Sequence, residues 1–218
     1  MKIQLKDNAV CGTMNTAALF RFDNTITENK NMETKTLEEI KRACEACEKC
    51  ELCKTRTNVV FGTGNANARL MFIGEAPGQK EDETGIPFVG AAGKLLDKYL
   101  DAVGIAREDV YIANILKCRP PKNRDPLPAE EDLCIGYLRE QVLAIRPKVI
   151  VCLGRISAMR IIKPDFKITA EHGKWFEKNG YSVCAVYHPA ALLRDPRKKD
   201  EMLADMIAIK QRMEAEDS

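Results

Sequence analysis

The sequence predicts an α/β fold built around a mostly parallel sheet. Four apolar segments have the length of strands, and they occupy residues 69–73, 110–115, 149–153 and 182–187. Each segment is nearly continuous rather than alternating, which is typical of central strands that are covered on both faces. Helical patterns separate the four segments, and this alternation indicates parallel strands joined by helices.

Four helical patterns lie between and after the predicted strands, at residues 93–103, 129–145, 156–162 and 199–214. Gly104 follows the first pattern and predicts the end of that helix, because glycine readily ends a helix. Pro128 precedes the second pattern and predicts its start, because proline is tolerated at the first helical position. Pro147 and Pro164 follow the second and third patterns, where a proline would interrupt a helix.

The amino-terminal region divides at about residue 33. Residues 1–33 are polar and weakly periodic, so we expect an extension that could be mobile, and we assign it no function. Residues 34–218 are expected to form a single domain, since a chain of 218 residues can bury one substantial core. Thr36 and Glu39 form a capping box, which predicts a helix whose apolar face carries Leu37, Ile40, Cys44 and Cys47.

The composition is that of a soluble globular protein, with 45% hydrophobic and 30% charged residues. No apolar run reaches the roughly 20 residues of a membrane span, and no signal peptide is recognisable, so a cytoplasmic protein is expected. The net charge is only +2, which means that any contact with nucleic acid must come from local clusters. Two basic clusters at 117–124 and 194–199 could neutralise phosphates, or they could be solvated loops.

Nine cysteines in a cytoplasmic chain favour metal or cluster ligation over disulfides, because reducing compartments keep thiols free. One possible ligand set is the local run with a spacing of three, Cys44, Cys47, Cys50 and Cys53. Another set joins two cysteines of this run to Cys118 and Cys134. Sets of four thiolates serve both zinc and iron-sulfur clusters, so the spacing leaves both open. Cys152 and Cys184 lie in predicted strands and are expected to be small buried hydrophobes, while Cys11 is unassigned.

The segment from Gly74 to Gly93 is the most informative stretch of the chain. It connects the strand predicted at 69–73 to the helix predicted at 93–103, and it combines glycines, prolines and acidic residues. Open α/β sheets bind ligands at the carboxyl ends of their strands, and glycines let the backbone approach a ligand closely. The carboxylates available for a reacting centre are those of Glu75, Glu81, Asp82 and Glu83. We therefore interpret this segment as an active-site loop.

Four motifs, in their order along the chain, resemble one known family. They are Gly-Glu-Ala-Pro-Gly at 74–78, Pro-Phe-Val-Gly at 87–90, Asn-Ile-Leu-Lys-Cys-Arg-Pro-Pro at 114–121 and His-Pro-Ala-Ala-Leu-Leu-Arg-Asp-Pro at 188–196. Together they resemble the family 4 uracil-DNA glycosylases, which carry a 4Fe-4S cluster, and the resemblance runs from about Cys47 to the last helix. It implies a three-layer α/β/α uracil-DNA glycosylase fold with a central four-stranded, mostly parallel sheet.

The same resemblance implies a function. The expected enzyme flips uracil out of single- or double-stranded DNA and hydrolyses its N-glycosidic bond, which leaves an abasic site during base-excision repair. The enzyme is expected to be a monomer and to have no membrane partner. One alternative is a non-catalytic iron-sulfur protein that binds nucleic acid on the same fold. Another is a variant glycosylase of the same superfamily that traps DNA covalently or prefers a different damaged base.

The resemblance also implies a substrate site. Phe88 would stack on the flipped base, Asn114 would bond to the pyrimidine edge, and His188 would donate a hydrogen bond to uracil O2. Gly74 and Ala76 would belong to the substrate-binding loop. Ala76 occupies the place where some other uracil-DNA glycosylase families carry a water-activating Asp, so modest base catalysis and a large electrostatic contribution are expected.

Glu75 and Glu81 are the candidate catalytic carboxylates, because glycosidic cleavage passes through a sugar cation that a carboxylate can stabilise while it orients water. The cluster ligands that the resemblance implies are Cys47, Cys50, Cys118 and Cys134. Cys44 and Cys53 are neighbours that could substitute for a ligand.

The segment from His188 onward would enter the minor groove beside the extruded nucleotide. Leu192 or Leu193 would act as the wedge, and Arg194 would contact a phosphate or fill the vacated space. The alternative is that both leucines simply begin a buried helix.

Overall fold

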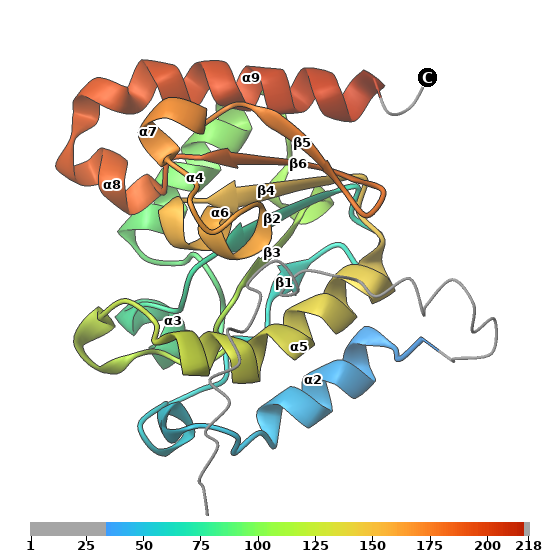
Figure 1. Ribbon diagram of the computed structural model, residues 1–218, viewed down its shortest axis with the longest axis vertical. Helices are drawn as coiled ribbons and strands as arrows, with labels where there is room; N and C mark the ends of the chain where they lie inside the picture. The colour runs from blue at the N-terminus through green and yellow to red at the C-terminus, as the bar shows by residue number, and fades with distance from the viewer. Residues whose placement is uncertain (1–33, 216–218) are drawn as a thin grey trace, which may run out of the picture.

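The computed structural model of the chain describes residues 34–215, and the extension predicted at residues 1–33 lies outside this range. The described residues form one six-stranded sheet with the strand order β1-β3-β2-β4-β6-β5 (Figure 1). The strands are β1 Thr63–Gly64, β2 Leu70–Gly74, β3 Tyr111–Asn114, β4 Val149–Leu153, β5 Trp175–Lys178 and β6 Tyr181–Val186. The four central strands β3, β2, β4 and β6 are parallel, which confirms the predicted centre of the sheet.

Two edge strands were not predicted from the sequence. Strand β1 pairs with β3 and strand β5 pairs with β6, in both cases antiparallel. Strand β1 has only two residues, and all four residues of β5 are at least partly exposed. Neither strand therefore has the continuous apolar run that identifies the central strands, and the sheet is mixed and wider than expected.

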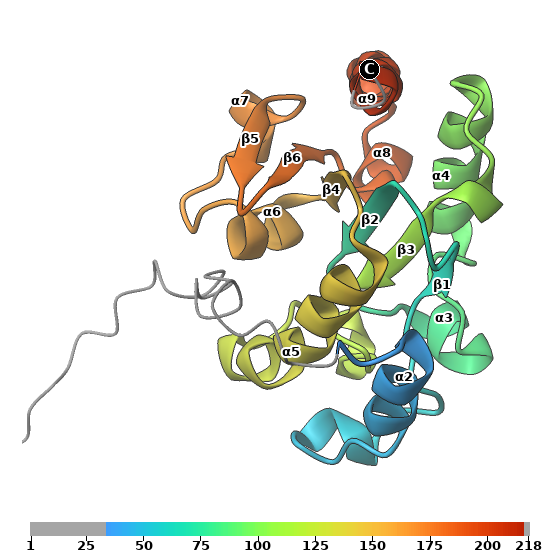
Figure 2. The same ribbon diagram turned by 90° about the vertical axis from the view of Figure 1, so that its right-hand side faces the viewer.

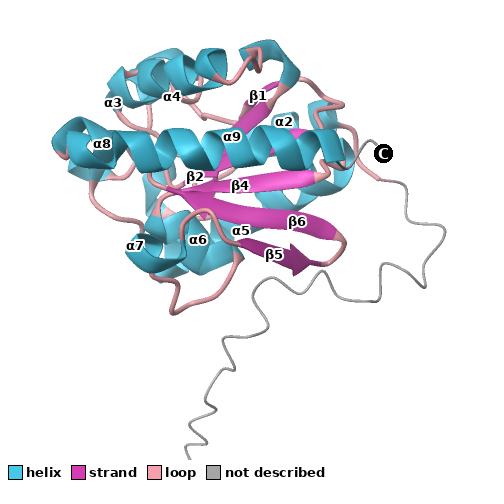
Figure 3. Ribbon diagram, turned by 90° about the horizontal axis from the view of Figure 1, so that it is seen from above, coloured by secondary structure: helices cyan, strands magenta, loops and turns pink. Residues whose placement is uncertain are grey.

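Helices cover both faces of the sheet, so the fold is the predicted three-layer α/β/α arrangement. They are α2 Leu37–Glu45, α3 Gln79–Thr84, α4 Ala91–Ala102, α5 Pro128–Ile145, α6 Arg155–Ile161, α7 Ile168–Glu171, α8 Pro189–Arg194 and α9 Lys199–Ala215. Phe72 and Val151 pack with α4, α8 and α9, whereas their neighbours Met71 and Ile150 pack with α5 and α6. Figure 2 shows these helical layers on opposite sides of the strands, and Figure 3 shows α9 running alongside β4 on one face of the sheet. No helix within residues 34–215 is both long and apolar enough to cross a membrane.

Helix α2 begins at the predicted capping box. Thr36 Oγ1 accepts a hydrogen bond from Glu39 N at 3.3 Å, and Glu39 Oε2 accepts one from Thr36 N at 2.8 Å. The helix ends at Glu45, because the chain tightens into a turn in which Cys47 N bonds to Cys44 O at 3.1 Å. The prediction that Cys47 lies on the helical face is therefore wrong.

All four parallel strands end at the same edge of the sheet. Strand β2 ends at Gly74, β3 ends at Asn114, Gly154 follows β4, and Tyr187 and His188 follow β6. Open α/β sheets bind ligands outside the carboxyl ends of their strands. This edge therefore carries the segments that the sequence identifies as functional.

Candidate active site and cysteine pocket

A cavity of about 500 Å³ opens at the carboxyl edge of the parallel strands. Its volume lies within the range of small-molecule sites. The predicted catalytic and substrate-binding residues that line it are Glu75, Ala76, Glu81, Phe88, Asn114, His188 and Arg194. Residues from four separate motifs thus share one cavity.

Asn114 presents an unsatisfied amide oxygen in the wall of the cavity. The residue ends β3 and is only 1% exposed. Its Oδ1 has no hydrogen-bond partner, whereas its main-chain oxygen accepts a hydrogen bond from Lys117 Nζ at 2.8 Å. An unpaired buried acceptor costs about 1–3 kcal/mol, and a ligand that brings a donor removes that cost.

Gly74 makes room for two of the side chains that line the cavity. It pairs with Asn114 in the ladder between β2 and β3. A Cβ atom at Gly74 would lie 2.3 Å from Asn114 Oδ1 and 2.7 Å from Phe88 Cζ, and both distances are shorter than real contacts. Any residue with a side chain would therefore displace the amide, the aromatic ring or both.

The ring of Phe88 lies beside the imidazole of His188, with 5.7 Å between the ring centroids and 34° between the planes. Phe88 has a φ of 54°, in the left-handed region that bulky residues rarely adopt. Its main chain rests on the first turn of α4, where a Cβ atom at Gly93 would lie 1.7 Å from Phe88 O. The surrounding structure therefore imposes this conformation.

His188 caps α8 and is neutral at physiological pH. Its Nδ1 accepts a hydrogen bond from Ala190 N at 3.1 Å, so the ring proton is assigned to Nε2. Burial, together with the positive charge of Arg194, lowers the pKa of His188 to about 4, although Glu81 opposes the shift. The imidazole can therefore offer Nε2–H as a neutral hydrogen-bond donor.

The two predicted catalytic carboxylates have different surroundings. Burial, and after it the negative charge of Asp125, raises the pKa of Glu75 to about 7. Glu81 Oε1 instead accepts hydrogen bonds from Val89 N at 3.0 Å and from Gly90 N at 2.8 Å. Glu75 is thus poised to titrate near neutral pH, whereas Glu81 holds the loop that leads into α4.

The two candidate wedge leucines on α8 differ in exposure. Leu192 is fully buried in the core that contains α4 and α9, as the alternative interpretation expects. Leu193 is 48% exposed, and Arg194 is exposed at the cavity. The prediction of a wedge therefore stays only for Leu193.

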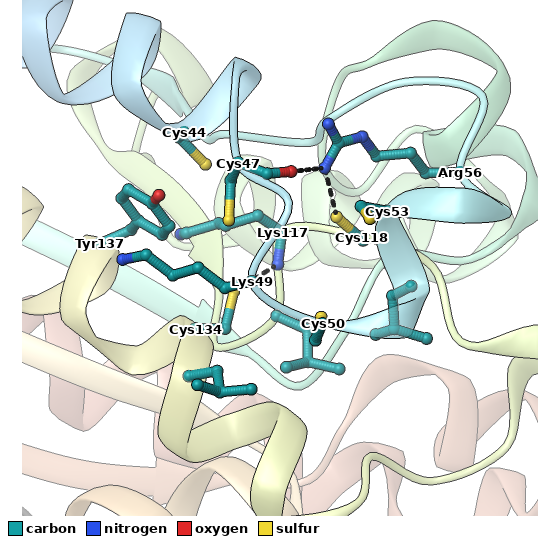
Figure 4. Close-up of a pocket in the computed structure, with 13 residues that line it drawn as sticks. Cys44, Cys47, Lys49, Cys50, Cys53, Arg56, Lys117, Cys118, Cys134 and Tyr137 are labelled. Atoms are coloured by element: carbon teal, nitrogen blue, oxygen red, sulfur yellow. Dashed lines mark hydrogen bonds between the residues drawn. The ribbon is translucent and has the colours of Figure 1, made fainter.

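A second pocket gathers cysteines from the end of α2, the segment through the short 3₁₀ helix η2 (Glu51–Lys54), the turn after β3, and α5 (Figure 4). The cysteines that line it are Cys44, Cys47, Cys50, Cys53, Cys118 and Cys134. Arg56 Nη1 donates to Cys118 Sγ at 3.4 Å, and Lys117 N donates to Cys134 Sγ at 3.3 Å. Residues 34–215 contain no group of three or more Cys, His, Asp or Glu side chains that could hold a single metal ion.

Lys117 is buried between the cysteine pocket and the cavity. It is 1% exposed, and its Nζ donates to Asn114 O at 2.8 Å and to Gln141 Oε1 at 2.7 Å. Burial lowers the pKa of Lys117 to about 8, although Cys134 and Cys44 oppose the shift. The interpretation of Lys117 as part of a phosphate-binding or solvated loop is therefore wrong, because neither phosphate nor bulk water reaches this side chain.

Two further cysteines are small buried hydrophobes, as predicted. Cys152 in β4 is 0% exposed and Cys184 in β6 is 1% exposed, and burial raises the pKa of both thiols. Cys11 lies outside the described residues.

Comparison with known proteins connects this geometry to a family. Residues 61–209 match the uracil DNA glycosylase superfamily. The chain is 50% identical over 179 residues to the type-4 uracil-DNA glycosylase of Archaeoglobus fulgidus, and the alignment covers 78% of this chain and 90% of that relative. The type-4 uracil-DNA glycosylase of Saccharolobus solfataricus is 44% identical over 167 residues, which cover 72% of this chain and 77% of the relative. The chain belongs to the type-4 uracil-DNA glycosylases.

The type-5 branch of the superfamily is more distant from this type-4 chain. A type-5 uracil-DNA glycosylase of Pyrobaculum aerophilum is 35% identical over 162 residues, which cover 66% of this chain and 71% of the relative. The family resemblance carried by the four sequence motifs is therefore confirmed.

Several residues around the cavity of this type-4 uracil-DNA glycosylase were not found by sequence reasoning. Gln141 is fully buried, and it donates to Phe61 O at 2.9 Å while it accepts from Lys117. Asp125 and Arg155 form a 3.3 Å ion pair in the cavity lining. The sequence offered one indication of Gln141, a polar residue inside a predicted helix. It offered none for Asp125 and Arg155, which come into contact only in the folded chain.

Proposed function

We propose that this protein removes uracil from DNA by hydrolysing the N-glycosidic bond, which leaves an abasic site. The observation that carries the proposal is the unpaired Oδ1 of Asn114, held in one cavity with the ring of Phe88 and the imidazole of His188. Similarity to proteins named type-4 uracil-DNA glycosylases over most of the chain supports the same function.

Recognition would take place after the nucleotide leaves the duplex, because an enzyme cannot reach a base inside the helix, and extrusion costs a few kcal/mol. Phe88 would stack on the extruded ring. Asn114 Oδ1 would accept a hydrogen bond from uracil N3–H, a donor that cytosine lacks. Cytosine would leave this buried acceptor unpaired, and such mismatches are rejected strongly.

Bond cleavage leaves negative charge on the uracil and positive charge on the sugar. His188 Nε2–H would donate to uracil O2 as charge develops there, and its pKa of about 4 keeps the imidazole neutral at physiological pH. Ionised Glu75 would stabilise the sugar cation and orient the attacking water. Glu81 would act indirectly, since its carboxylate holds the loop that carries Phe88.

The cysteine pocket is the proposed site of a 4Fe-4S cluster, whose ligands would be Cys47, Cys50, Cys118 and Cys134. The pocket supplies more than the four thiols that such a cluster needs, with Cys44 and Cys53 as neighbours able to substitute. A cluster spreads its ligands over several iron atoms, so it does not need the close grouping that a single ion requires. The guanidinium of Arg56 lies beside Cys118 Sγ, and its positive charge would balance an anionic cluster, while the main-chain N–H of Lys117 donates to Cys134 Sγ. The bound cluster would cross-link segments far apart in the sequence and stabilise the fold.

The DNA contact would centre on α8. Exposed Leu193 would enter the minor groove next to the extruded nucleotide, and Arg194 would contact a phosphate or fill the vacated space.

An excision assay tests the proposal. The purified protein should convert a uracil-containing oligonucleotide into an alkali-labile one, and Asn114→Ala or His188→Ala should slow this by about 100-fold or more at nearly unchanged melting temperature. Lys35→Gln is a control, because it breaks an exposed 2.7 Å ion pair with Glu140 outside the cavity lining. A wild-type protein that binds DNA without releasing uracil would favour the non-catalytic alternative. Full activity in either alanine variant would refute the site.

A further inference from the structure

The conformation of Phe88 depends on the two peptide groups that flank its Cα atom. A φ of 54° is unfavourable for a bulky residue, which keeps it only when the surroundings hold both peptide groups in place. This backbone conformation sets the direction of the Cα–Cβ bond that carries the ring to its place beside His188.

The peptide group after Phe88 is held from one side of the loop. Glu81 Oε1 accepts hydrogen bonds from Val89 N at 3.0 Å and from Gly90 N at 2.8 Å. The first of these amides belongs to the Phe88–Val89 peptide group, so Glu81 restrains ψ of Phe88. It does not restrain the peptide group that precedes Phe88.

Arg107 holds the preceding peptide group. Its Nη2 donates a hydrogen bond to Pro87 O at 2.8 Å, and its Nη1 forms an ion pair with Asp97. Arg107 begins the short 3₁₀ helix η3 (Arg107–Asp109), Asp97 lies on α4, and neither lines the cavity. The Pro87 carbonyl belongs to the Pro87–Phe88 peptide group, so Arg107 restrains φ of Phe88.

We propose that Arg107, oriented by Asp97, is a positioning residue for the base-stacking ring of Phe88. This inference rests on the proposed function, in which that ring receives the extruded base. Arg107 and Glu81 together fix φ and ψ of Phe88 before DNA arrives, so the ring needs no reorganisation when uracil enters. Without Arg107 the Pro87–Phe88 peptide group can rotate, φ can return to its favoured region, and the ring leaves its place beside His188.

A direct contact of Arg107 with DNA phosphate is the competing explanation, because its side chain is 30% exposed. The two explanations differ in salt dependence. Loss of a phosphate contact reduces the slope of log affinity against log salt by about 1, whereas loss of a positioning residue leaves that slope unchanged.

The experiment compares wild type, Arg107→Gln and the control Lys35→Gln on a uracil-containing duplex. For Arg107→Gln we expect the single-turnover rate at saturating DNA to fall about 10-fold, which corresponds to about 1.4 kcal/mol. We expect the DNA dissociation constant and its salt slope to stay at wild-type values. A fluorine label on the ring of Phe88 should give one NMR resonance in wild type and in Lys35→Gln, and a shifted or split resonance in Arg107→Gln.

Asp97→Asn supplies a second variant if Arg107→Gln does not fold. It keeps the hydrogen bond to Pro87 O but frees the guanidinium from its ion pair, so a smaller loss of rate and a smaller shift of the fluorine resonance are expected. An unchanged rate and resonance in the folded variant, or a changed salt slope, would overturn the proposal. Failure of wild type to release uracil would instead refute the proposed function, while the fluorine resonance would still report whether Arg107 positions the ring of Phe88.

Discussion

Glu75 should make uracil excision depend on pH, and Glu75→Gln should remove that dependence. Burial and the charge of Asp125 raise the pKa of Glu75 to about 7. About 9% of the carboxyl groups are then ionised at about pH 6 and about 91% at about pH 8, so the single-turnover rate should rise roughly tenfold between these two pH values. His188, with a pKa of about 4, stays neutral in this pH range and therefore adds no second titration to the rate profile.

The raised pKa of Glu75 also predicts how stability depends on pH. Between its ordinary pKa of 4.5 and about 7, the folded protein retains a proton that the unfolded chain has released. The stability contributed by protonated Glu75 is therefore fully present below about pH 4.5 and is lost as pH rises through about 7, by at most about 3 kcal/mol. Glu75→Gln avoids this loss, so its Tm should exceed that of wild type by several degrees at about pH 8.5 and be similar at about pH 4.5.

Two measurements check this reasoning. Single-turnover excision from a uracil-containing oligonucleotide, from about pH 5.5 to about pH 8.5, gives the rate profile. Thermal melting of both proteins at the two ends of the range gives the difference in Tm. A flat wild-type rate profile, or a Gln variant with the same profile as wild type, would refute the role of Glu75. The same Tm difference at low and high pH would show that Glu75 does not titrate near pH 7.

Three further predictions concern the cavity, the cysteine pocket and the DNA contact. Gly74→Ala places a Cβ atom 2.3 Å from Asn114 Oδ1, so excision should slow by about 100-fold, and a wild-type rate would contradict the cavity geometry. Cys118→Ser should lose most of the bound iron, the brown absorption and several degrees of Tm, whereas Cys152→Ser should keep the absorption; loss of colour in both would argue against the ligand set. Leu193→Ala should slow excision about tenfold on duplex DNA and little on single strands, since only the duplex needs a wedge, and equal slowing on both would exclude that role.

The sequence by itself determined the fold class and the main side chains that line the cavity. Continuous apolar runs identified β2, β3, β4 and β6, because buried parallel strands need apolar side chains on both faces. The capping box at Thr36 marked the start of α2, since capping involves residues three apart. The four motifs led to Phe88, Asn114 and His188, which the structure brings into one cavity.

Only the tertiary structure decided which polar and apolar groups are buried and what they bond to. The sequence could not separate buried Leu192 from exposed Leu193, because adjacent residues differ only in the direction that α8 gives them. Lys117 belongs to a basic cluster in the sequence, yet it is enclosed by Asn114 and Gln141. The physical reason is the separation along the chain of the residues that interact. Helix, strand and cap preferences are set by residues within a few positions of each other, whereas burial, pKa and backbone strain depend on partners that reach a residue only when distant segments pack together.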